Sequence, residues 1–149
     1  MDKASIEGIS LTKLKIIDHP QGDIYHAMKK SDYGFKNFGE AYFSTIMKNE
    51  VKGWKKNKKM TLNLVVPIGE VTFVLFDDRK NSLTFNKKKS VKISPSNYFR
   101  LTIPPKIWYA FKGHSSTSNL ILNITDYEHQ SDCILREELD TFQFDWDKI

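Results

Sequence analysis

The chain has 149 residues, of which 40% are hydrophobic and 13% aromatic, a composition that can bury the core of one folded domain. Its formal net charge is +5, but only three of the 23 basic residues are arginine, and these are dispersed. Because readers of duplex DNA rely on bidentate arginine, nucleic-acid binding is disfavoured. A small phosphorylated ligand suits the charge as well as any nucleic acid.

Cys133 is the single cysteine, so we expect no intramolecular disulfide and interpret it as a structural thiol. The first residues contain no apolar run typical of a signal peptide. No later stretch approaches the roughly 20 apolar residues of a membrane span. The sequence therefore predicts a cytoplasmic protein that does not bind membranes.

The first clear strand signal is a run of aromatic and β-branched residues over 40–47. Residues 52–59 hold five lysines in eight positions, a pattern that indicates a solvated loop or a strand end near bound anions. Residues 60–66 and 70–76 predict two more strands. The Pro67–Gly69 turn between them favours a hairpin.

Further strands are predicted over 90–93, 98–103, 108–112 and 119–125. We interpret Lys87–Lys89 as the charged tip of a hairpin. In the acidic tail, Phe142, Phe144 and Trp146 alternate with polar residues, which predicts that one face of the tail packs on the rest of the protein.

Strands at roughly ten-residue intervals, with turn residues between them and no long helical stripe, predict an antiparallel sandwich or barrel. A jelly roll fits best. The sequence shows no internal repeat and no linker, so we expect residues 1–149 to form a single domain.

Several segments, taken in order, resemble the dTDP-4-dehydrorhamnose 3,5-epimerases, more particularly a divergent branch of that family. The resemblance covers Gly22–Trp146, and its most specific parts are Gly22–His26, Phe38–Ser44, Lys52–Trp54, Lys59–Asn63, Asp77–Arg79, Ile103–Trp108 and Phe144–Trp146. It implies an all-β, cupin-type double-stranded β-helix (jelly roll) that forms a homodimer. It also implies a barrel mouth that binds a nucleoside-diphosphate 4-keto-6-deoxy sugar, with no metal or cofactor.

Epimerisation beside a ketone needs a base, a group that holds the enolate, and an acid on the opposite face. In the family the base is a histidine two residues after the glycine of the Lys52-Gly53 pair, and that position is Lys55 here. As a base at pH 7, Lys55 would need its pKa of about 10.4 to fall by some three units. Burial and neighbouring lysines act in that direction, but a bound diphosphate opposes them. Lys55 is therefore expected to act as a base if the structure shields its amine from water. Otherwise we expect its ammonium to stabilise an enolate or bind a phosphate.

Tyr127 resembles the segment that carries the family's catalytic tyrosine, which implies that it is the acid. Lys52 holds the place of the family's basic contact to the diphosphate. Asn57 stands where relatives with two histidines in this segment place the second. Tyr109 follows Trp108, where many epimerases have another histidine, and it is either a sugar contact or part of the barrel wall.

Asn63 is polar within an apolar strand, so it either points into the barrel toward a sugar hydroxyl or satisfies a neighbouring backbone group. His26 and Glu40 lie in matched segments and complete the candidate substrate-binding set. The four histidines are scattered without a His-x-His pair, so no metal site is predicted.

Two functions remain open at this point. The first is a sugar-nucleotide epimerase or isomerase of cell-surface polysaccharide synthesis that works through Lys55 or another base. The second is a non-catalytic cupin that binds a sugar nucleotide and has lost turnover together with the histidine.

Overall fold

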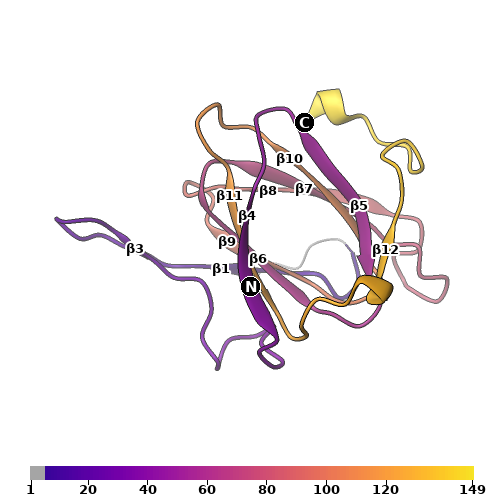
Figure 1. Cartoon of the computed structure of the whole chain (residues 1–149), viewed down its shortest axis with the longest axis horizontal. Helices are drawn as coiled ribbons and strands as arrows, with labels where there is room; N and C mark the ends of the chain where they lie inside the picture. The colour runs from indigo at the N-terminus through magenta and orange to yellow at the C-terminus, as the bar shows by residue number, and fades with distance from the viewer. Residues whose placement is uncertain (1–5) are drawn as a thin grey trace.

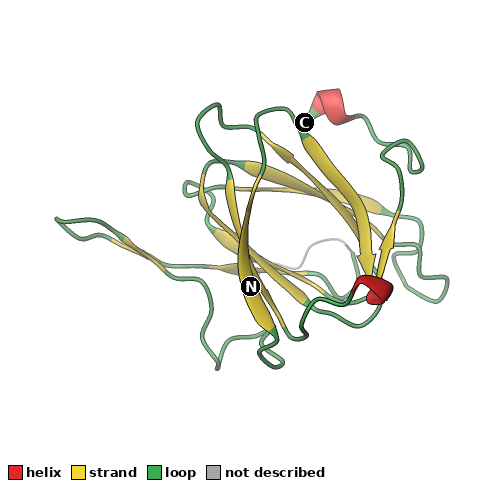
Figure 2. Ribbon diagram, viewed as in Figure 1, coloured by secondary structure: helices red, strands yellow, loops and turns green. Residues whose placement is uncertain are grey.

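The computed structural model describes residues 6–149, which form two five-stranded sheets and a separate two-stranded arm (Figures 1 and 2). Every ladder between two strands is antiparallel, so the predicted all-β antiparallel architecture is confirmed. In this part of the chain, helix is limited to two 3-10 turns, Ser131–Cys133 and Trp146–Lys148. No helix of residues 6–149 has the length and apolar character to cross a membrane.

The strands of the first sheet, in spatial order, are β1 (Ser10–Lys13), β9 (Phe99–Ile103), β6 (Leu62–Ile68), β11 (Leu120–Thr125) and β4 (Glu40–Thr45). Those of the second sheet are β12 (Ile134–Arg136), β5 (Val51–Asn57), β10 (Trp108–Gly113), β7 (Val71–Phe76) and β8 (Lys88–Ile93). The arm pairs β2 (Ile16–Ile17) with β3 (Ile24–Tyr25) and projects away from the barrel (Figure 1).

The main core lies between the two sheets. Side chains alternate along each strand, so Phe73 and Leu75 of β7 join this core while Val74 and Phe76 face the other side of the second sheet. Both faces of β7 are buried, which explains its uninterrupted apolar sequence. Each such side chain, fully buried, stabilises the fold by about 1.5–3 kcal/mol.

The outer face of the second sheet is covered by the C-terminal tail, residues 137–149. Phe142 lies 5.5 Å from the ring of Trp54 and 5.1 Å from the ring of Trp108, centroid to centroid. The Lys112 ammonium donates a hydrogen bond of 2.7 Å to the carbonyl of Trp146. The predicted packing of the tail is thus confirmed.

The predicted hairpin across Pro67–Gly69 is wrong. The strand before the turn, β6, pairs with β9 and β11 in the first sheet, whereas β7 pairs with β8 and β10 in the second. The turn therefore carries the chain from one sheet to the other. Periodicity identifies a strand but not its partner, because pairing depends on residues distant in sequence.

The two lysine-rich segments are only partly as predicted. Of the two alternatives for residues 52–59, a loop or a strand end, the structure shows the strand: β5 covers Val51–Asn57, its Trp54 packs under the tail, and Lys58 and Lys59 follow the strand end. Lys88 and Lys89 belong to β8, and the tip of the β7–β8 hairpin is the preceding loop. The short strands β1, β2, β3 and β12 were not predicted, since each is too brief to show a period.

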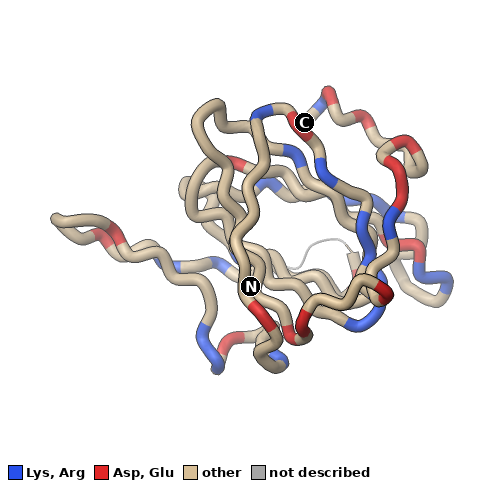
Figure 3. Tube along the Cα trace, viewed as in Figure 1, with Lys and Arg blue, Asp and Glu red and all other residues tan. Residues whose placement is uncertain are grey.

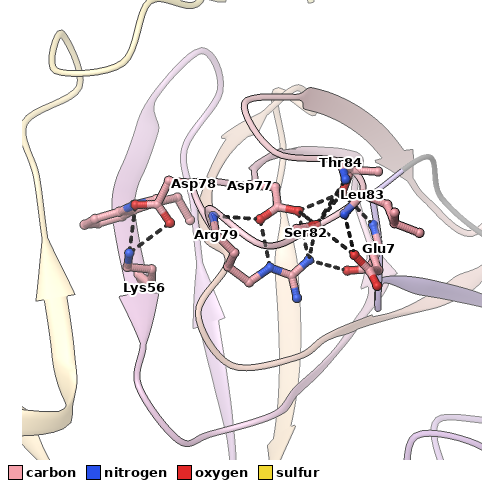
Figure 4. A network of polar contacts seen from close by, with 9 residues as sticks. Glu7, Lys56, Asp77, Asp78, Arg79, Ser82, Leu83 and Thr84 are labelled. Atoms are coloured by element: carbon pink, nitrogen blue, oxygen red, sulfur yellow. Dashed lines mark hydrogen bonds and ion pairs between the residues drawn. The ribbon is translucent and has the colours of Figure 1, made fainter.

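The loop after β7 is held by Asp77, whose side chain has no exposed surface (Figure 4). One carboxylate oxygen accepts a hydrogen bond of 2.8 Å from Arg79 Nε, and the other accepts from the hydroxyls of Ser82 and Thr84 at 2.6 and 2.7 Å. Burial acts to raise the pKa of Asp77, but these donors outweigh it and hold the pKa far below its usual range. The Arg79 guanidinium also donates to the Glu7 carbonyl, which ties the N-terminal segment to this loop.

Candidate functional site

A β-bulge in β5 brings two lysines to the same face of the second sheet. Tyr109 of β10 is opposite Lys55, and Phe111 is opposite Lys52, so two residues of β5 face the single residue Ala110. In a regular strand, side chains three positions apart point to opposite faces. The extra residue corrects this offset, and both lysines face the space between the sheets.

Gly53 is required at the bulge. Its backbone has φ +144°, which side-chain-bearing residues rarely adopt, and a Cβ there would overlap Ala110 of β10. The Lys-Gly pair therefore fixes where the β5 lysines enter the barrel. Figure 3 shows the basic positions recurring along β5, with the acidic tail beyond them.

The two lysines line a pocket of about 100 Å³ between the sheets. Five strands supply its walls: β5 and β10 from the second sheet, and β4, β6 and β11 from the first. Its lining residues are Tyr42, Ser44, Lys52, Lys55, Leu64, Tyr109, Phe111, Ile121 and Asn123. No histidine, aspartate or glutamate of the described chain is among them.

Lys55 is half-buried on the pocket wall. Burial lowers the pKa of its ammonium, and the positive charges of Arg136 and Lys52 lower the pKa further. Arg136 of β12 is the direct cross-strand neighbour of Lys55. These effects all favour the neutral amine, so the environment has the direction that a catalytic lysine needs.

Tyr109 lies opposite Lys55 in the ladder and is only 8% exposed. Burial raises the pKa of its hydroxyl above the ordinary range, and Tyr42 adds to the rise, while Asn57 and Arg136 oppose it. The phenol is therefore protonated at neutral pH. It can donate a hydrogen bond to an oxygen bound in the pocket.

Tyr42 and Asn123 form the opposite wall, and sequence analysis missed both. Asn123 Nδ2 donates a hydrogen bond of 2.9 Å to the Tyr42 hydroxyl. The buried Asn123 Oδ1 has no hydrogen-bond partner within residues 6–149 and is an acceptor available to a ligand. The available signal was the polar residues at alternate positions, Tyr42 and Ser44 in β4 and Asn123 and Thr125 in β11, because they break the apolar pattern expected of inward positions.

Of the other predicted residues on β5, Lys52 is exposed at the pocket rim, where its ammonium donates a 2.6 Å hydrogen bond to the Thr45 carbonyl. Asn57 is buried at the far end of the strand, close enough to Tyr109 to influence its pKa. It lines a second, smaller hollow together with Tyr127. That hollow also contains Cys133 at its edge.

The structure places Tyr127 outside the Lys55 pocket, with 53% of its surface exposed. His26 lies in a separate groove beside the loop that follows the arm. Glu40 begins β4, opposite Thr125. None of these three residues is part of the Lys55 pocket. Each lies at or beyond the end of a strand, whereas the pocket residues lie within strands.

Asn63 hydrogen-bonds a neighbouring backbone group, which is the second of its two predicted alternatives. Its Nδ2 donates to the Gly34 carbonyl at 3.2 Å, and its Oδ1 accepts from the Thr102 hydroxyl at 2.7 Å. Beside it, the fully buried Arg100 donates to the carbonyls of Ala27 and Tyr33. These residues hold the loop between β3 and β4 against the outer face of the first sheet, so Asn63 does not point into the barrel.

Within residues 6–149, no three His, Cys, Asp or Glu side chains are grouped as metal ligands. The chemistry available in the pocket is instead that of an amine, two phenols, an amide and a rim ammonium. Such a set can bind a polar ligand, exchange protons with it, or react with a carbonyl group.

The family described as dTDP-4-dehydrorhamnose 3,5-epimerase matches residues 3–149 of the chain. The crystal structure of a dTDP sugar isomerase from Desulfovibrio desulfuricans G20 is 34% identical, covers 97% of this chain and 94% of its own, and superposes with a TM-score of 0.93. The probable low-salt glycan biosynthesis epimerase Agl13 of Haloferax volcanii is 25% identical over 111 residues, which are 71% of each protein.

Similarity of fold extends to more distant structures. The epimerase RmlC from Legionella pneumophila Philadelphia 1, crystallised with dTDP-4-keto-L-rhamnose, has a TM-score of 0.82 at 20% identity and covers 91% of this chain and 76% of its own. The dTDP-4-dehydrorhamnose 3,5-epimerase from Elizabethkingia anophelis NUHP1 has a TM-score of 0.83 at 17% identity, covering 97% and 84%. These likenesses confirm the predicted cupin-type jelly roll.

Proposed function

Because the chain belongs to the dTDP-4-dehydrorhamnose 3,5-epimerase family, we propose that it epimerises or isomerises a nucleoside-diphosphate 4-keto-6-deoxyhexose at a carbon beside the ketone. The observation that carries the proposal is the half-buried, cation-flanked Lys55 opposite the buried phenol of Tyr109. The ligands in the crystal structures of relatives, such as dTDP-4-keto-L-rhamnose, support the substrate class.

Each pocket wall has a role in this reaction. Removal of the proton beside the ketone depends on the amine of Lys55, whose neutral form is favoured by burial and by the nearby cations, and Tyr109 donates a hydrogen bond to the ketone oxygen as negative charge develops there. Tyr42, on the opposite sheet, is placed to return a proton to the other face, the role that the sequence had indicated for Tyr127. Lys52 at the rim attracts the diphosphate as a point charge.

The size of the pocket limits what enters it. A complete sugar nucleotide needs several times its volume of about 100 Å³. Only the ketone end of the sugar fits between Lys55 and Tyr42, and the diphosphate stays near Lys52. A diphosphate held at the rim also acts less strongly on the pKa of Lys55 than one held inside.

Proton exchange tests the proposal. The protein is incubated in heavy water with a dTDP-linked 4-keto-6-deoxyhexose, and the C3 and C5 proton signals are followed by NMR. We expect exchange above the protein-free blank and its loss in Lys55→Ala, since that change removes the half-buried amine of the pocket wall. Lys30→Ala, at an exposed loop position, is the matched control and should exchange like the wild type. No exchange by the wild type would refute the proposal for this substrate.

The alternative is a cupin that binds a sugar nucleotide without turnover. It is favoured by the lack of histidine and carboxylate among the residues that line the pocket in the described chain. Calorimetric binding of the same sugar nucleotide, with no proton exchange above the blank, would establish this alternative.

We also propose that the protein is a homodimer and that it acts in glycan synthesis. The name of Agl13 as a glycan biosynthesis epimerase supports the pathway. Exposed apolar side chains on the arm and on β4 support the dimer, because a second copy would cover them. The cytoplasm is the compartment predicted from the sequence.

A further inference from the structure

Lys55 differs in its contacts from Lys52 and Lys56 of β5 and from Lys58, which follows the strand. Lys52 donates to the Thr45 carbonyl, Lys56 pairs with Asp78 at 2.9 Å, and Lys58 donates to the Asp132 carbonyl at 3.1 Å. For Lys55, by contrast, residues 6–149 provide neither a hydrogen bond nor an ion pair. Its nitrogen is therefore free to approach a ligand, and no carboxylate holds it in the protonated state.

The surroundings of Lys55 match those of lysines that react covalently with carbonyl compounds. A lysine becomes a nucleophile when it is desolvated or placed beside another cation, and both conditions are present here. Leu64, Phe111 and Ile121 give the pocket an apolar part, which favours the loss of water from an addition product. The phenol of Tyr109 supplies a proton donor on the adjoining strand.

We propose that Lys55 captures the ketone of the substrate as a covalent imine, an inference that rests on the proposed function of the same pocket. A ketone that enters to form a hydrogen bond with Tyr109 approaches the cross-strand neighbour of that residue, which is Lys55. Directly opposed side chains in an antiparallel ladder have Cβ atoms about 4.5–5.5 Å apart. Both can therefore reach one carbonyl group.

The chemical steps balance without a further reactant. The Lys55 lone pair forms the C–N bond, the π electrons move to oxygen, and this oxygen takes the Tyr109 proton. Nitrogen loses a proton, which restores the phenol through solvent, and a second proton from solvent converts the hydroxyl group to water, which leaves. The resulting iminium acidifies the neighbouring C–H bond, so solvent suffices as the base, and the electron pair of that bond moves toward nitrogen to give an enamine. Solvent then returns a proton to this carbon and restores the iminium, and addition of water releases the ketone, the free amine and the proton taken up earlier.

Reductive trapping tests the proposal. The full-length protein is mixed with a dTDP-linked 4-keto-6-deoxyhexose and cyanoborohydride, and the adduct is located by intact-mass and peptide mass spectrometry. We expect one adduct, with the mass of the ligand less one oxygen, on Lys55 of the wild type and of Lys30→Ala. Lys55→Arg keeps the charge and should reduce labelling to background. No adduct at Lys55, or labelling spread evenly over the lysines, would overturn the proposal.

A histidine variant separates this proposal from simple base catalysis. Histidine can accept a proton but cannot form an imine with a ketone, so we expect Lys55→His to lose proton exchange along with labelling. Enzyme-dependent wash-in of oxygen-18 from labelled water into the ketone should accompany imine formation in the wild type. Proton exchange without adduct or oxygen-18 wash-in would overturn the imine and leave the epimerase proposal intact. An adduct without proton exchange would support the imine and refute the epimerase proposal.

Discussion

Asp77 shows how one buried carboxylate organises a long loop. Its two oxygens accept hydrogen bonds from the side chains of Arg79, Ser82 and Thr84, so these three side chains depend on one negative charge (Figure 4). We expect Asp77→Asn to lower the free energy of unfolding by about 3 kcal/mol at neutral pH. The neutral amide leaves the Arg79 guanidinium without its counter-charge, and the NH2 group of the amide faces hydrogen-bond donors of the loop. Chemical denaturation measures the loss.

The same prediction has a definite pH dependence. The pKa of Asp77 is lowered on folding, so its contribution is present above the unfolded-state pKa of about 4 and is lost as the pH falls below that value. The difference between wild type and Asp77→Asn should therefore shrink in acid. Asp140→Asn, an exposed position without hydrogen bonds in the described chain, is the control and should change stability by less than about 0.5 kcal/mol. A constant difference down to acidic pH would contradict the assignment.

At the scale of elements, the C-terminal tail supports the strand that carries the site. Trp54 lies between Lys52 and Lys55, and its ring is fully buried under Phe142 and Trp146. The outward face of β5 is thus clamped by the tail while the inward face presents the amine. Packing on one side of the strand fixes the geometry on the other, since the bulge permits little independent movement.

We expect Phe142→Ala to destabilise the protein by about 2 kcal/mol, because the ring is partly buried and contacts three other rings. Tryptophan fluorescence during denaturation measures both the stability and the exposure of Trp54 and Trp108. The neighbouring Gln143→Ala, at an exposed position, should have little effect. A Phe142→Ala protein as stable as the wild type would show that the tail does not contribute to the clamp.

At the scale of the whole molecule, the arm and the edge strand β4 both expose large apolar side chains. On the arm, Ile24 is 53% exposed and Tyr25 40%, and on the edge strand β4, Phe43 is 64% exposed. The arm extends beyond the barrel (Figure 1), and at its base the ring of Tyr25 lies 5.6 Å from that of Tyr98, centroid to centroid. A two-stranded ribbon is marginally stable by itself. We therefore expect a second copy of the chain to cover the exposed apolar side chains of the arm.

We expect light scattering to give twice the mass of the chain for the wild type and the mass of one chain for Ile24→Lys combined with Phe43→Glu. Leu83→Glu is the matched control, because Leu83 is 88% exposed on the β7–β8 loop, at a distance in the chain from both elements. A monomeric wild type at micromolar concentration would refute the dimer. A dimer that persists in the double variant would place the interface elsewhere.

The sequence by itself determined the strands with the clearest composition and the packing face of the tail. These properties depend on residues close together in the chain, where the two-residue period and the matched segments can be read directly. Family membership is likewise a property of the order and spacing of segments.

Only the tertiary structure decided which side chains share the pocket. Alternation predicts that Lys52 and Lys55 lie on opposite faces of β5, and the bulge opposite Ala110 reverses this. Tyr42, Lys55, Tyr109 and Asn123 come from four strands whose pairing depends on contacts distant in sequence. For the same reason, Asn63 and Tyr127 could not be separated from the pocket residues by pattern alone.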